Sequence, residues 1–466
     1  MNPPIKSGLF DQNERVLVIG VGRSGRASIS VLAPRVAALY ATDENPNVDV
    51  SSLGAPFVAP DTLGDVLPNV SVAVLSPGIP LNGELVRRVQ SAGVPVFSEV
   101  EVAYRICRAP IVAVTGTKGK TTTTALIGEI FRRAGKTTYV GGNIGNALIH
   151  ETAVAAPEDW VIAEVSSFQL ESIRSFKPRI SLILNISPDH LDRYFSMDEY
   201  AEAKFRVFAN QGAGDIFIGN LDDERIAALA QGDDANRVKA RALWFADEPH
   251  RSTALYVRNG ETIVFAPPTG DPRPVEIMRV DEIALRGRHN LENVMGAILT
   301  GLAAGLDRTA IAGAVRDFRA LHHRLERVGE RGGVEYVDDS KATNPGSVMA
   351  ALRSFDRPVV LIAGGKAKGT DFADMGRVAS SRTKAVVLIG QAADDIAKTI
   401  KRASVHRAAT MEEAVHIAAS VAQAGDAVLL SPGCASFDMF VSAEDRGEQF
   451  AAAVQRLDAG VREHAR

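Results

Sequence analysis

The sequence predicts an α/β protein of three domains, each built on a mostly parallel sheet. The chain has 466 residues, and a typical domain has about 150. Short apolar runs end at Gly, Asn or Asp and lead into segments with helical periodicity, which is typical of a parallel sheet covered by helices. This alternation restarts near residues 110 and 333, so we expect three separate sheets.

The composition is that of an ordinary globular protein, with 46% hydrophobic and 23% charged residues. The 52 Lys and Arg against 56 Asp and Glu leave a net charge of −4, which provides no overall positive field for nucleic acid. The two cysteines are too few for a disulfide framework, no apolar run approaches the ~20 residues of a membrane helix, and the first ten residues contain no signal-like stretch. We therefore expect a cytoplasmic protein without a nucleic-acid partner or a membrane span.

The first predicted domain, residues 1–98, carries a glycine-rich turn. Gly20, Gly22 and Gly25 follow its first apolar run, and Asp43 ends the second run, 18 residues beyond Gly25. Such glycines permit a tight turn against a diphosphate, and the carboxylate of the acidic residue can accept a hydrogen bond from a ribose hydroxyl. By itself the motif fits a nicotinamide-dependent dehydrogenase, another nucleotide-diphosphate site or a purely structural turn. The apolar runs lie at 15–22, 37–44, 71–78 and 95–100, with a helix-like segment at 84–93.

The second predicted domain, residues 99–320, begins with a phosphate-binding loop. The segment PIVAVTGTKGKTT (110–122) indicates strand, glycine loop and helix start, where backbone N–H groups and a helix dipole can hold phosphates. Lys120 would neutralise the β- and γ-phosphates, and Thr121 would offer its hydroxyl to Mg²⁺. The general pattern has a glycine where this chain has Val114, so the loop is a shortened variant. The flanking strand and helix favour nucleotide binding over an ordinary Gly-Lys turn.

Other segments of this domain carry candidate metal ligands. Glu164 ends one apolar run and His190 follows another, and parallel strands end at one edge of a sheet, so both side chains can approach the metal at Thr121. Carboxylate and imidazole suit Mg²⁺ or Mn²⁺, whereas His190 alone would indicate a loop histidine. Lys204 lies on a predicted amphipathic helix, where a solvated lysine is the usual case. An Asn-Gly pair within 213–280 predicts an antiparallel hairpin and hence a mixed-sheet flank.

The third predicted domain, residues 321–466, repeats the strand and helix pattern from 333 onward. Its polar set comprises Arg324, the segment 339–344, Lys366 and Lys368. Each of these alone is as consistent with a solvated loop as with a site. Together, an arginine and several lysines facing a phosphate loop would suit an anionic co-substrate and the charge of a transferred phosphoryl group.

The combined motifs resemble the Mur ligase family, ATP-dependent amide-bond-forming enzymes of peptidoglycan precursor synthesis. The family-level marks are TGTKGKTT (115–122), Glu164, NISPDHLDR (185–193), Lys204 and GRHNLENV (287–294). Four other segments resemble the D-glutamate-adding members, and the DNPR-type motif of the diaminopimelate-adding members is absent from the sequence. These four are GGNIG (141–145), EVSSFQLE (164–171), DDSKATNP (338–345) and SPGCASFDMF (431–440).

The resemblance implies an N-terminal Rossmann-like domain for a UDP moiety, a central P-loop ATPase, and a C-terminal Rossmann-like domain that closes on the substrates. It implies ATP-dependent ligation of D-glutamate to UDP-N-acetylmuramoyl-L-alanine through an acyl phosphate, with release of ADP and phosphate. It also assigns the first glycine turn to the uridine diphosphate instead of NAD. We expect a monomer that binds these three substrates.

By the same resemblance, Lys120, Glu164, His190 and Lys204 are the catalytic residues. Thr121 and Glu164 would hold one Mg²⁺, and His190 with N-carboxylated Lys204 would hold a second. The residues expected to bind ATP are Gly116, Thr117, Lys118, Gly119, Lys120, Thr121, Thr122, Asn290, Arg324 and Asp339. Those expected to bind the UDP substrate are Gly22, Arg23, Ser24, Asp43, Ser76, Gly78, Asn143 and Gln169. Those expected to bind D-glutamate are Lys341, Thr343, Lys368 and Ser436.

Two positions depart from the family pattern. Ala443 stands where the pattern usually has an aromatic residue, and Lys366 stands where it often has an acidic one. A glutamate contact made by the backbone at 443 would survive the change, whereas ring packing would not. The alternatives are a sister ligase that adds another amino acid, a nicotinamide-dependent dehydrogenase, and a P-loop module without catalysis.

Overall fold

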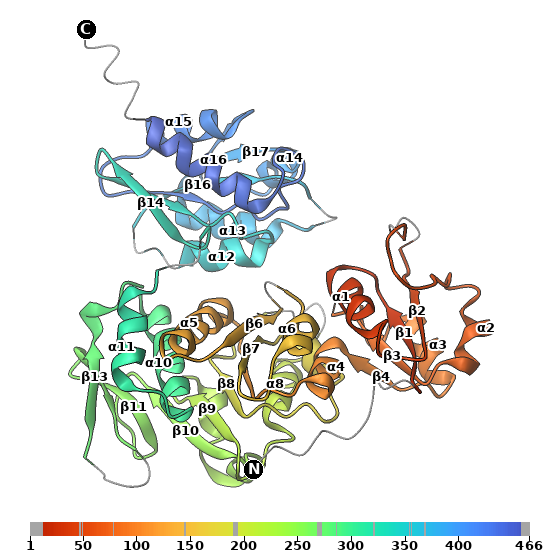
Figure 1. Ribbon diagram of the computed structural model, residues 1–466. Helices are drawn as coiled ribbons and strands as arrows, with labels where there is room; N and C mark the ends of the chain where they lie inside the picture. The colour runs from red at the N-terminus through yellow and green to blue at the C-terminus, as the bar shows by residue number, and fades with distance from the viewer. Residues whose placement is uncertain are drawn as a thin grey trace. The chain divides into compact units, whose positions relative to one another are not determined.

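The computed structural model divides the chain into two compact units, Met1–Phe318 and Arg319–Arg466 (Figure 1). The second unit begins two residues before the boundary predicted at 321. Of the predicted site residues, Gly78, His190 and Lys368 lie outside the described part of the chain. The structure describes residues 13–45, 48, 50–77, 79–143, 146–189, 194–267, 273–285, 287–319, 322–353, 355, 357–367 and 370–457.

The first sheet has four parallel strands in the order β2-β1-β3-β4. Residues Val16 to Ile19 of strand β1 are fully buried, because the side chains on both faces of the sheet pack against helices. The strands are β1 (Arg15–Ile19), β2 (Ala38–Thr42), β3 (Val72–Leu75) and β4 (Val96–Ser98). The helices are α1 (Arg23–Leu32), α2 (Leu63–Val66), the 3₁₀ turn Leu67–Asn69 and α3 (Glu84–Ser91).

The second sheet has nine strands in the order β13-β12-β11-β10-β9-β8-β5-β7-β6. Its strands from β5 to β11 pair in parallel, and β12 and β13 are antiparallel. The predicted hairpin is confirmed, since Asn259 and Gly260 join β11 to β12 with φ of 54° and 71°, values that Asn and Gly tolerate best. The strands are β5 (Ile111–Thr115), β6 (Thr138–Gly142), β7 (Trp160–Glu164), β8 (Ile180–Ile183), β9 (Ile216–Asn220), β10 (Arg241–Ala246), β11 (Thr253–Arg258), β12 (Thr262–Phe265) and β13 (Val275–Arg279).

Helices cover both faces of this sheet. Figure 1 shows α5, α10 and α11 side by side on one face, where α5 packs against the other two. The helices are α4 (Glu99–Ile106), α5 (Lys120–Arg133), α6 (Leu148–Val154), α7 (Ser167–Glu171), α8 (Met197–Phe205), α9 (Glu224–Ala228), α10 (Arg288–Ala303) and α11 (Arg308–Asp317). The 3₁₀ turns are Arg206–Phe208, Gly232–Arg237 and Val280–Glu282.

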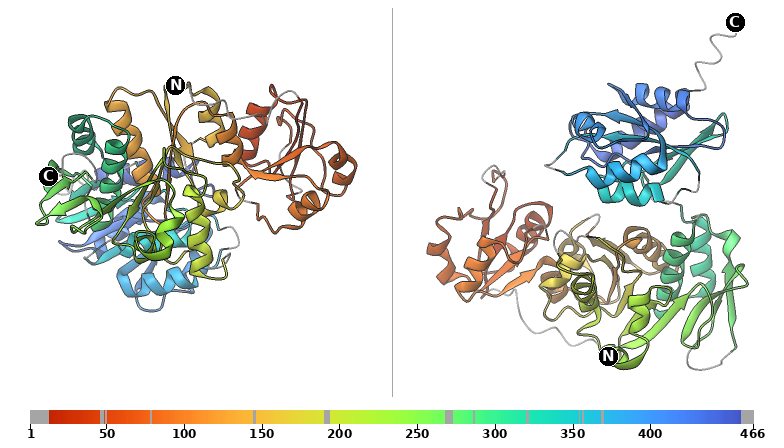
Figure 2. Two further views of the ribbon diagram at one scale, coloured as in Figure 1. Left: turned by 90° about the horizontal axis from the view of Figure 1, so that it is seen from below. Right: turned by 180° about the vertical axis from the view of Figure 1, so that it is seen from behind.

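The second unit is coloured from teal to blue in Figure 2. It contains one six-stranded sheet in the order β14-β15-β19-β16-β17-β18. Five strands run parallel, and the edge strand β14 is antiparallel, a feature that the sequence analysis did not predict. The strands are β14 (Glu326–Arg331), β15 (Val334–Asp338), β16 (Val359–Gly364), β17 (Thr383–Ile389), β18 (Ser404–Arg407) and β19 (Ala427–Leu430). The helices are α12 (Pro345–Arg353), α13 (Ala373–Arg382), α14 (Ala393–Ala397), α15 (Met411–Val421) and α16 (Ala443–Arg456).

The three sheets and their helices confirm the predicted α/β class. Within the described residues, no helix combines the length and the apolar character that crossing a membrane requires.

The helix that follows the first sheet begins at a buried carboxyl group, Glu99. Its Oε1 accepts a 2.7 Å hydrogen bond from the N–H of Ile149, whereas Oε2 has no hydrogen-bond partner among the described residues. Burial raises the pKa of Glu99 from 4.5 to about 7, although the Ile149 N–H and the charge of Arg23 act in the opposite direction. The ionised form of Glu99 therefore destabilises the folded chain.

Glu99→Gln should stabilise the protein in a pH-dependent way. The folded chain keeps the Glu99 proton up to about pH 7, while the unfolded chain releases it near 4.5, so wild-type stability falls between these values. The glutamine keeps an oxygen for Ile149, and we expect a gain in unfolding free energy on the order of 1–3 kcal/mol at pH 8 and none at pH 4. Urea unfolding at both pH values measures this difference. The exposed Glu158→Gln serves as control, and a gain independent of pH would contradict the explanation.

Candidate active site

A glycine loop connects β5 to α5 and lies against α10. Gly116 and Gly119 have φ of 147° and 81°, which L side chains rarely adopt. A Cβ at Gly119 would also overlap the Oδ1 of Asn293, so the close approach of loop and helix requires glycine there. The loop ends at the N-terminus of a 14-residue helix, whose dipole favours a bound phosphate.

The Lys120 side chain folds back over this loop. Its Nζ donates hydrogen bonds to the carbonyl oxygens of Gly116, at 2.9 Å, and Thr117, at 2.8 Å. The backbone N–H of Lys118 donates to Asn185 Oδ1 at 2.8 Å, which fixes the other side of the loop. The positive charge is thus held at the loop before any ligand arrives.

Thr121 and Glu164 meet at the carboxyl edge of the sheet. The Thr121 hydroxyl donates to Glu164 Oε2 at 2.9 Å, and Asn143 Nδ2 donates to Oε1 at 2.8 Å. Glu164 is buried at the end of β7. A carboxylate and a hydroxyl beside a phosphate loop are oxygen donors of the kind that Mg²⁺ prefers, so these residues fit a magnesium ion.

Lys204 is buried at the same loop. Only 1% of it is exposed, and its Nζ donates to Gly116 O at 2.8 Å and lies 4.4 Å from the centre of the Tyr200 ring. Burial, assisted by the charge of Lys120, lowers the pKa of Lys204 well below its usual value and favours the neutral amine. The expectation of a solvated lysine at this position is wrong, because α8 is buried around Tyr200, Ala203 and Lys204.

Several residues that support the loop were not predicted from the sequence. Asn293 lies against Gly119 of the loop, and its Nδ2 donates a 3.3 Å hydrogen bond to Asn290 Oδ1. Asn290, which is predicted to bind ATP, is therefore held beside the loop. The buried Thr117 hydroxyl lies 3.3 Å from the Tyr200 hydroxyl. Asn293 falls within the GRHNLENV segment, but nothing in the sequence separated its role from that of Asn290.

A cavity of about 360 Å³ adjoins Glu164, and it is lined by every predicted UDP-substrate residue that lies in the described part of the chain. Asp43 holds the glycine turn, because its Oδ2 accepts the Val21 N–H at 2.7 Å. Asn143 lines the cavity and also bonds Glu164, so the cavity and the candidate magnesium ligands are contiguous. The lining residues are Gly20, Gly22, Arg23, Ser24, Asp43, Ser76, Pro77, Ile79, Gly142, Asn143 and Gln169.

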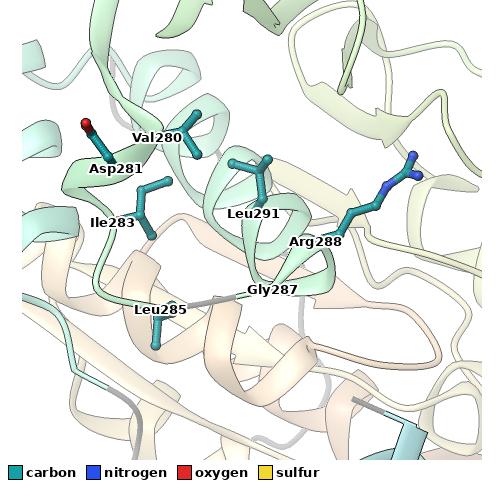
Figure 3. A pocket seen from close by; sticks show the side chains of 7 residues that line it. All are labelled: Val280, Asp281, Ile283, Leu285, Gly287, Arg288 and Leu291. Atoms are coloured by element: carbon teal, nitrogen blue, oxygen red, sulfur yellow. The ribbon is translucent and has the colours of Figure 1, made fainter. Parts of the chain in front are cut away.

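A second cavity, of about 520 Å³, lies at the start of α10. Figure 3 shows Val280, Ile283 and Leu291 around a common space, which Arg288 also lines. The Arg288 guanidinium pairs with Asp247, with 2.8 Å between Nε and Oδ2. This mostly aliphatic cavity, which also includes Asp281, Leu285 and Gly287, was not predicted.

In the second unit, predicted residues gather where neighbouring strands end. Asp339 follows β15, its Oδ2 accepts the Ser431 hydroxyl at 2.8 Å, and burial raises its pKa to about 7. The Lys341 ammonium pairs with Glu444 at the start of α16. Thr343 donates its N–H to the Lys341 carbonyl at 3.0 Å, and Ser436 is buried on the loop after β19.

The segment that carries Arg324 is held in an unusual conformation. His323 and Leu325, its neighbours, have φ of 64° and 46°, and His323 Nδ1 lies 2.7 Å from Asp338 Oδ2. The backbone N–H of His323 also donates to Glu326 Oε2 at 2.8 Å. Such left-handed conformations persist only where surrounding contacts hold them, and here those contacts orient the segment beside Asp339.

Comparison with known proteins decides the family. The profile of the Mur ligase middle domain matches residues 114–301, and that of the Mur ligase glutamate ligase domain matches residues 323–434. A protein of Pelotomaculum thermopropionicum named UDP-N-acetylmuramoylalanine–D-glutamate ligase is 43% identical over 457 residues, which cover 96% of this chain and 98% of that protein. The chain belongs to the Mur ligase family.

Other Mur ligases agree in sequence and in fold. A protein of Trichlorobacter lovleyi with the same name is 41% identical over 96% of this chain and 99% of its own length. The solved UDP-N-acetylmuramate–alanine ligase of Thermotoga maritima matches with a TM-score of 0.56 at 17% identity, over 96% of this chain and 100% of that one. The MurF ligase of the same organism, solved with ADP, matches with a TM-score of 0.55 at 16% identity, over 96% of each chain. At these identities the two structures establish the Mur ligase fold alone.

Proposed function

We propose that this Mur ligase joins D-glutamate to UDP-N-acetylmuramoyl-L-alanine at the expense of ATP, in peptidoglycan precursor synthesis. The observation that carries the proposal is Asn143, which lines the UDP cavity and bonds the Glu164 carboxylate beside the phosphate loop. A substrate in that cavity can extend its terminal carboxylate toward the γ-phosphate. The name shared by relatives over nearly the full chain supports D-glutamate as the amino acid.

The first half of the reaction activates a carboxylate. An oxygen of the terminal carboxylate of the UDP substrate attacks the γ-phosphorus of ATP, and the bond from that phosphorus to the β,γ-bridging oxygen breaks. The products are an acyl phosphate and ADP. Residues 116–122 and the start of α5 hold the phosphates, and Lys120 offsets their charge. Thr121 and Glu164 would hold a magnesium ion, which would supply positive charge that stabilises the transferred phosphoryl group.

The second half forms the amide. The amine of D-glutamate, after losing a proton, attacks the acyl carbon, and the tetrahedral intermediate collapses with release of phosphate. Lys341, Thr343 and Ser436, together with Lys368, would bind the two carboxylates of the amino acid. Arg324 and Asp339 would contact ATP from the second unit. We further propose that the chain has three domains, residues 1–98, 99–320 and 321–466, which close on the ligands.

We propose that Lys204 becomes N-carboxylated. Its buried, neutral amine is the form that attacks carbon dioxide, and the product is a carbamate with release of one proton. The carbamate is anionic and would ligate a second divalent ion together with His190. Mg²⁺ is the expected ion at both positions and Mn²⁺ an acceptable substitute.

In the UDP cavity, Arg23 is the cation and Ser24, Ser76, Asn143 and Gln169 supply polar groups for the diphosphate and sugar. Gly22 and Gly78 would allow close backbone approach. We further propose that the enzyme acts as a cytoplasmic monomer.

An amino-acid panel tests the proposed function. ADP release and radiolabelled UDP-substrate conversion would be measured with D-glutamate, L-glutamate, L-lysine and meso-diaminopimelate. We expect turnover with D-glutamate only, and only when ATP and the UDP substrate are both present. Turnover with another amino acid would indicate a sister ligase, and ATP hydrolysis without either co-substrate would indicate a non-ligating P-loop module. Tight binding of NAD without ATPase activity would overturn the ligase proposal entirely.

A further inference from the structure

Arg446 is a buried cation in the first turns of α16. None of its surface is exposed, and it makes no direct ion pair with a carboxylate among the described residues, although the charges of Asp438 and Asp338 act on it from farther away. Burial lowers the pKa of Arg446 only to about 10, so the guanidinium stays charged at neutral pH. A buried charge without a carboxylate in direct contact is costly to maintain and needs a structural or functional reason.

All three nitrogens of the guanidinium group donate hydrogen bonds to loops. Nε donates to Ser340 Oγ at 2.9 Å, Nη2 to Ser340 O at 2.8 Å, and Nη1 to Cys434 O at 3.1 Å. The Ser340 hydroxyl in turn donates to Ala443 O at 2.7 Å, which ties the loop to the start of the same helix. One side chain therefore fixes the loop after β15 to the loop after β19.

These two loops carry the residues assigned to D-glutamate. Ser340 immediately precedes Lys341, and Cys434 lies two residues before Ser436. A third loop joins them, because Lys366 donates its N–H to Ala435 O at 2.8 Å and a Cβ at Gly365 would lie 3.3 Å from Arg446 Nη1. Arg446 thus lies behind the point where three strand-end loops converge.

We propose that Arg446 is the positioning residue of the amino-acid site: its guanidinium sets the spacing between the Lys341 and Ser436 loops and adds positive charge behind them for an anionic amino acid. The inference rests on the proposed function for the identity of that amino acid. Lysine cannot replace the arginine, because one ammonium nitrogen cannot reach the carbonyls of both loops in the planar geometry of the fork. The Ala443 position gains a role as well, since its carbonyl accepts the Ser340 hydroxyl whatever side chain it bears.

The test compares Arg446→Gln and Arg446→Lys with wild type in the ADP-release assay. We expect the KM for D-glutamate to rise by about tenfold or more in Arg446→Gln and by a smaller factor in Arg446→Lys. The KM for the UDP substrate should stay within about twofold of wild type, because its residues lie in the first unit, and the KM for ATP should rise by a smaller factor than that for D-glutamate, because Asp339 is adjacent to Ser340. Ser340→Ala, which removes only the hydroxyl link, should raise the same KM modestly, and the double variant should be no worse than Arg446→Gln.

Arg206→Gln is the matched control. Arg206 also donates to two main-chain carbonyls, Leu170 O and Ile173 O, each at 2.7 Å, but it lies in the first unit. It should lower Tm without raising the KM for D-glutamate selectively. An unchanged KM in folded Arg446→Gln, an equal rise of all three KM values, or the same selective rise in Arg206→Gln would each overturn the inference.

These measurements distinguish failure of the Arg446 proposal from failure of the proposed function. If wild type uses a different amino acid, the proposed function fails, and the KM of that amino acid becomes the readout for Arg446. If Arg446→Gln does not fold, Arg446→Lys and Ser340→Ala decide the outcome.

Discussion

Replacing Lys120 by alanine should lower kcat by about a thousandfold or more. Its ammonium is held over the phosphate loop by the carbonyls of Gly116 and Thr117, so it needs no rearrangement to meet the charge on the transferred phosphoryl group. Removing it exposes both carbonyl oxygens to the incoming phosphates and adds repulsion to the lost attraction. Single-turnover formation of ADP from ATP and the UDP substrate measures the chemical step directly.

Lys136→Ala is the control for this prediction. Lys136 is an exposed lysine just beyond the far end of α5 and takes no part in the loop. It should keep the wild-type rate, which would show that general loss of positive charge does not explain the defect. A Lys120→Ala enzyme with a rate within about tenfold of wild type would refute the assigned role.

Lys204→Ala should lower kcat by about a hundredfold or more, and short-chain carboxylic acids should restore part of the activity. The buried amine lies 2.8 Å from Gly116 O, so its carbamate would form within the same phosphate-loop site. A small carboxylate that enters the space left by the side chain can replace the carbamate as a metal ligand. Bicarbonate labelled with ¹³C should give a carbamate resonance in wild type that disappears in the variant.

The exposed Lys239→Ala provides the comparison, with unchanged activity and an unchanged resonance. Full activity of Lys204→Ala would exclude a catalytic role for the carbamate. Loss of activity together with a wild-type enzyme that shows no carbamate signal would leave Lys204 as an amine that supports the loop, which contradicts carboxylation.

The glycine loop before α5 and the meeting of Glu164 with Thr121 illustrate what pattern and spacing can predict. A glycine loop after an apolar run is a local feature, and its function depends on the backbone of a few consecutive residues. The strand ends that bring Glu164 to Thr121 follow from parallel topology, which the alternating pattern already indicates. The Asn259-Gly260 hairpin is local in the same sense, and all three predictions agree with the geometry.

Lys204 and Arg446 illustrate what local pattern leaves undecided. Both lie on helices whose sequences mix charged and apolar residues, so periodicity assigns each a solvated face by default. Their burial depends on what packs against those helices: the Gly116 loop for Lys204 and the loops at Ser340 and Cys434 for Arg446. The antiparallel edge strand β14 was not predicted for a related reason, since the direction of a strand depends on the strand with which it pairs.

The sequence by itself determined the α/β class, the glycine loop before α5, the hairpin and, through its motifs, the family. These features are encoded by residues that are neighbours in the chain, where backbone conformation and hydrophobic period act directly. Only the tertiary structure decided that Asn143 connects the cavity beside Arg23 to Glu164, that the Lys204 amine is buried, and that Arg446 joins two loops. Each of these depends on contacts between residues far apart in the chain, and burial, pKa and hydrogen-bond partners follow from such contacts and not from the identity of the residue.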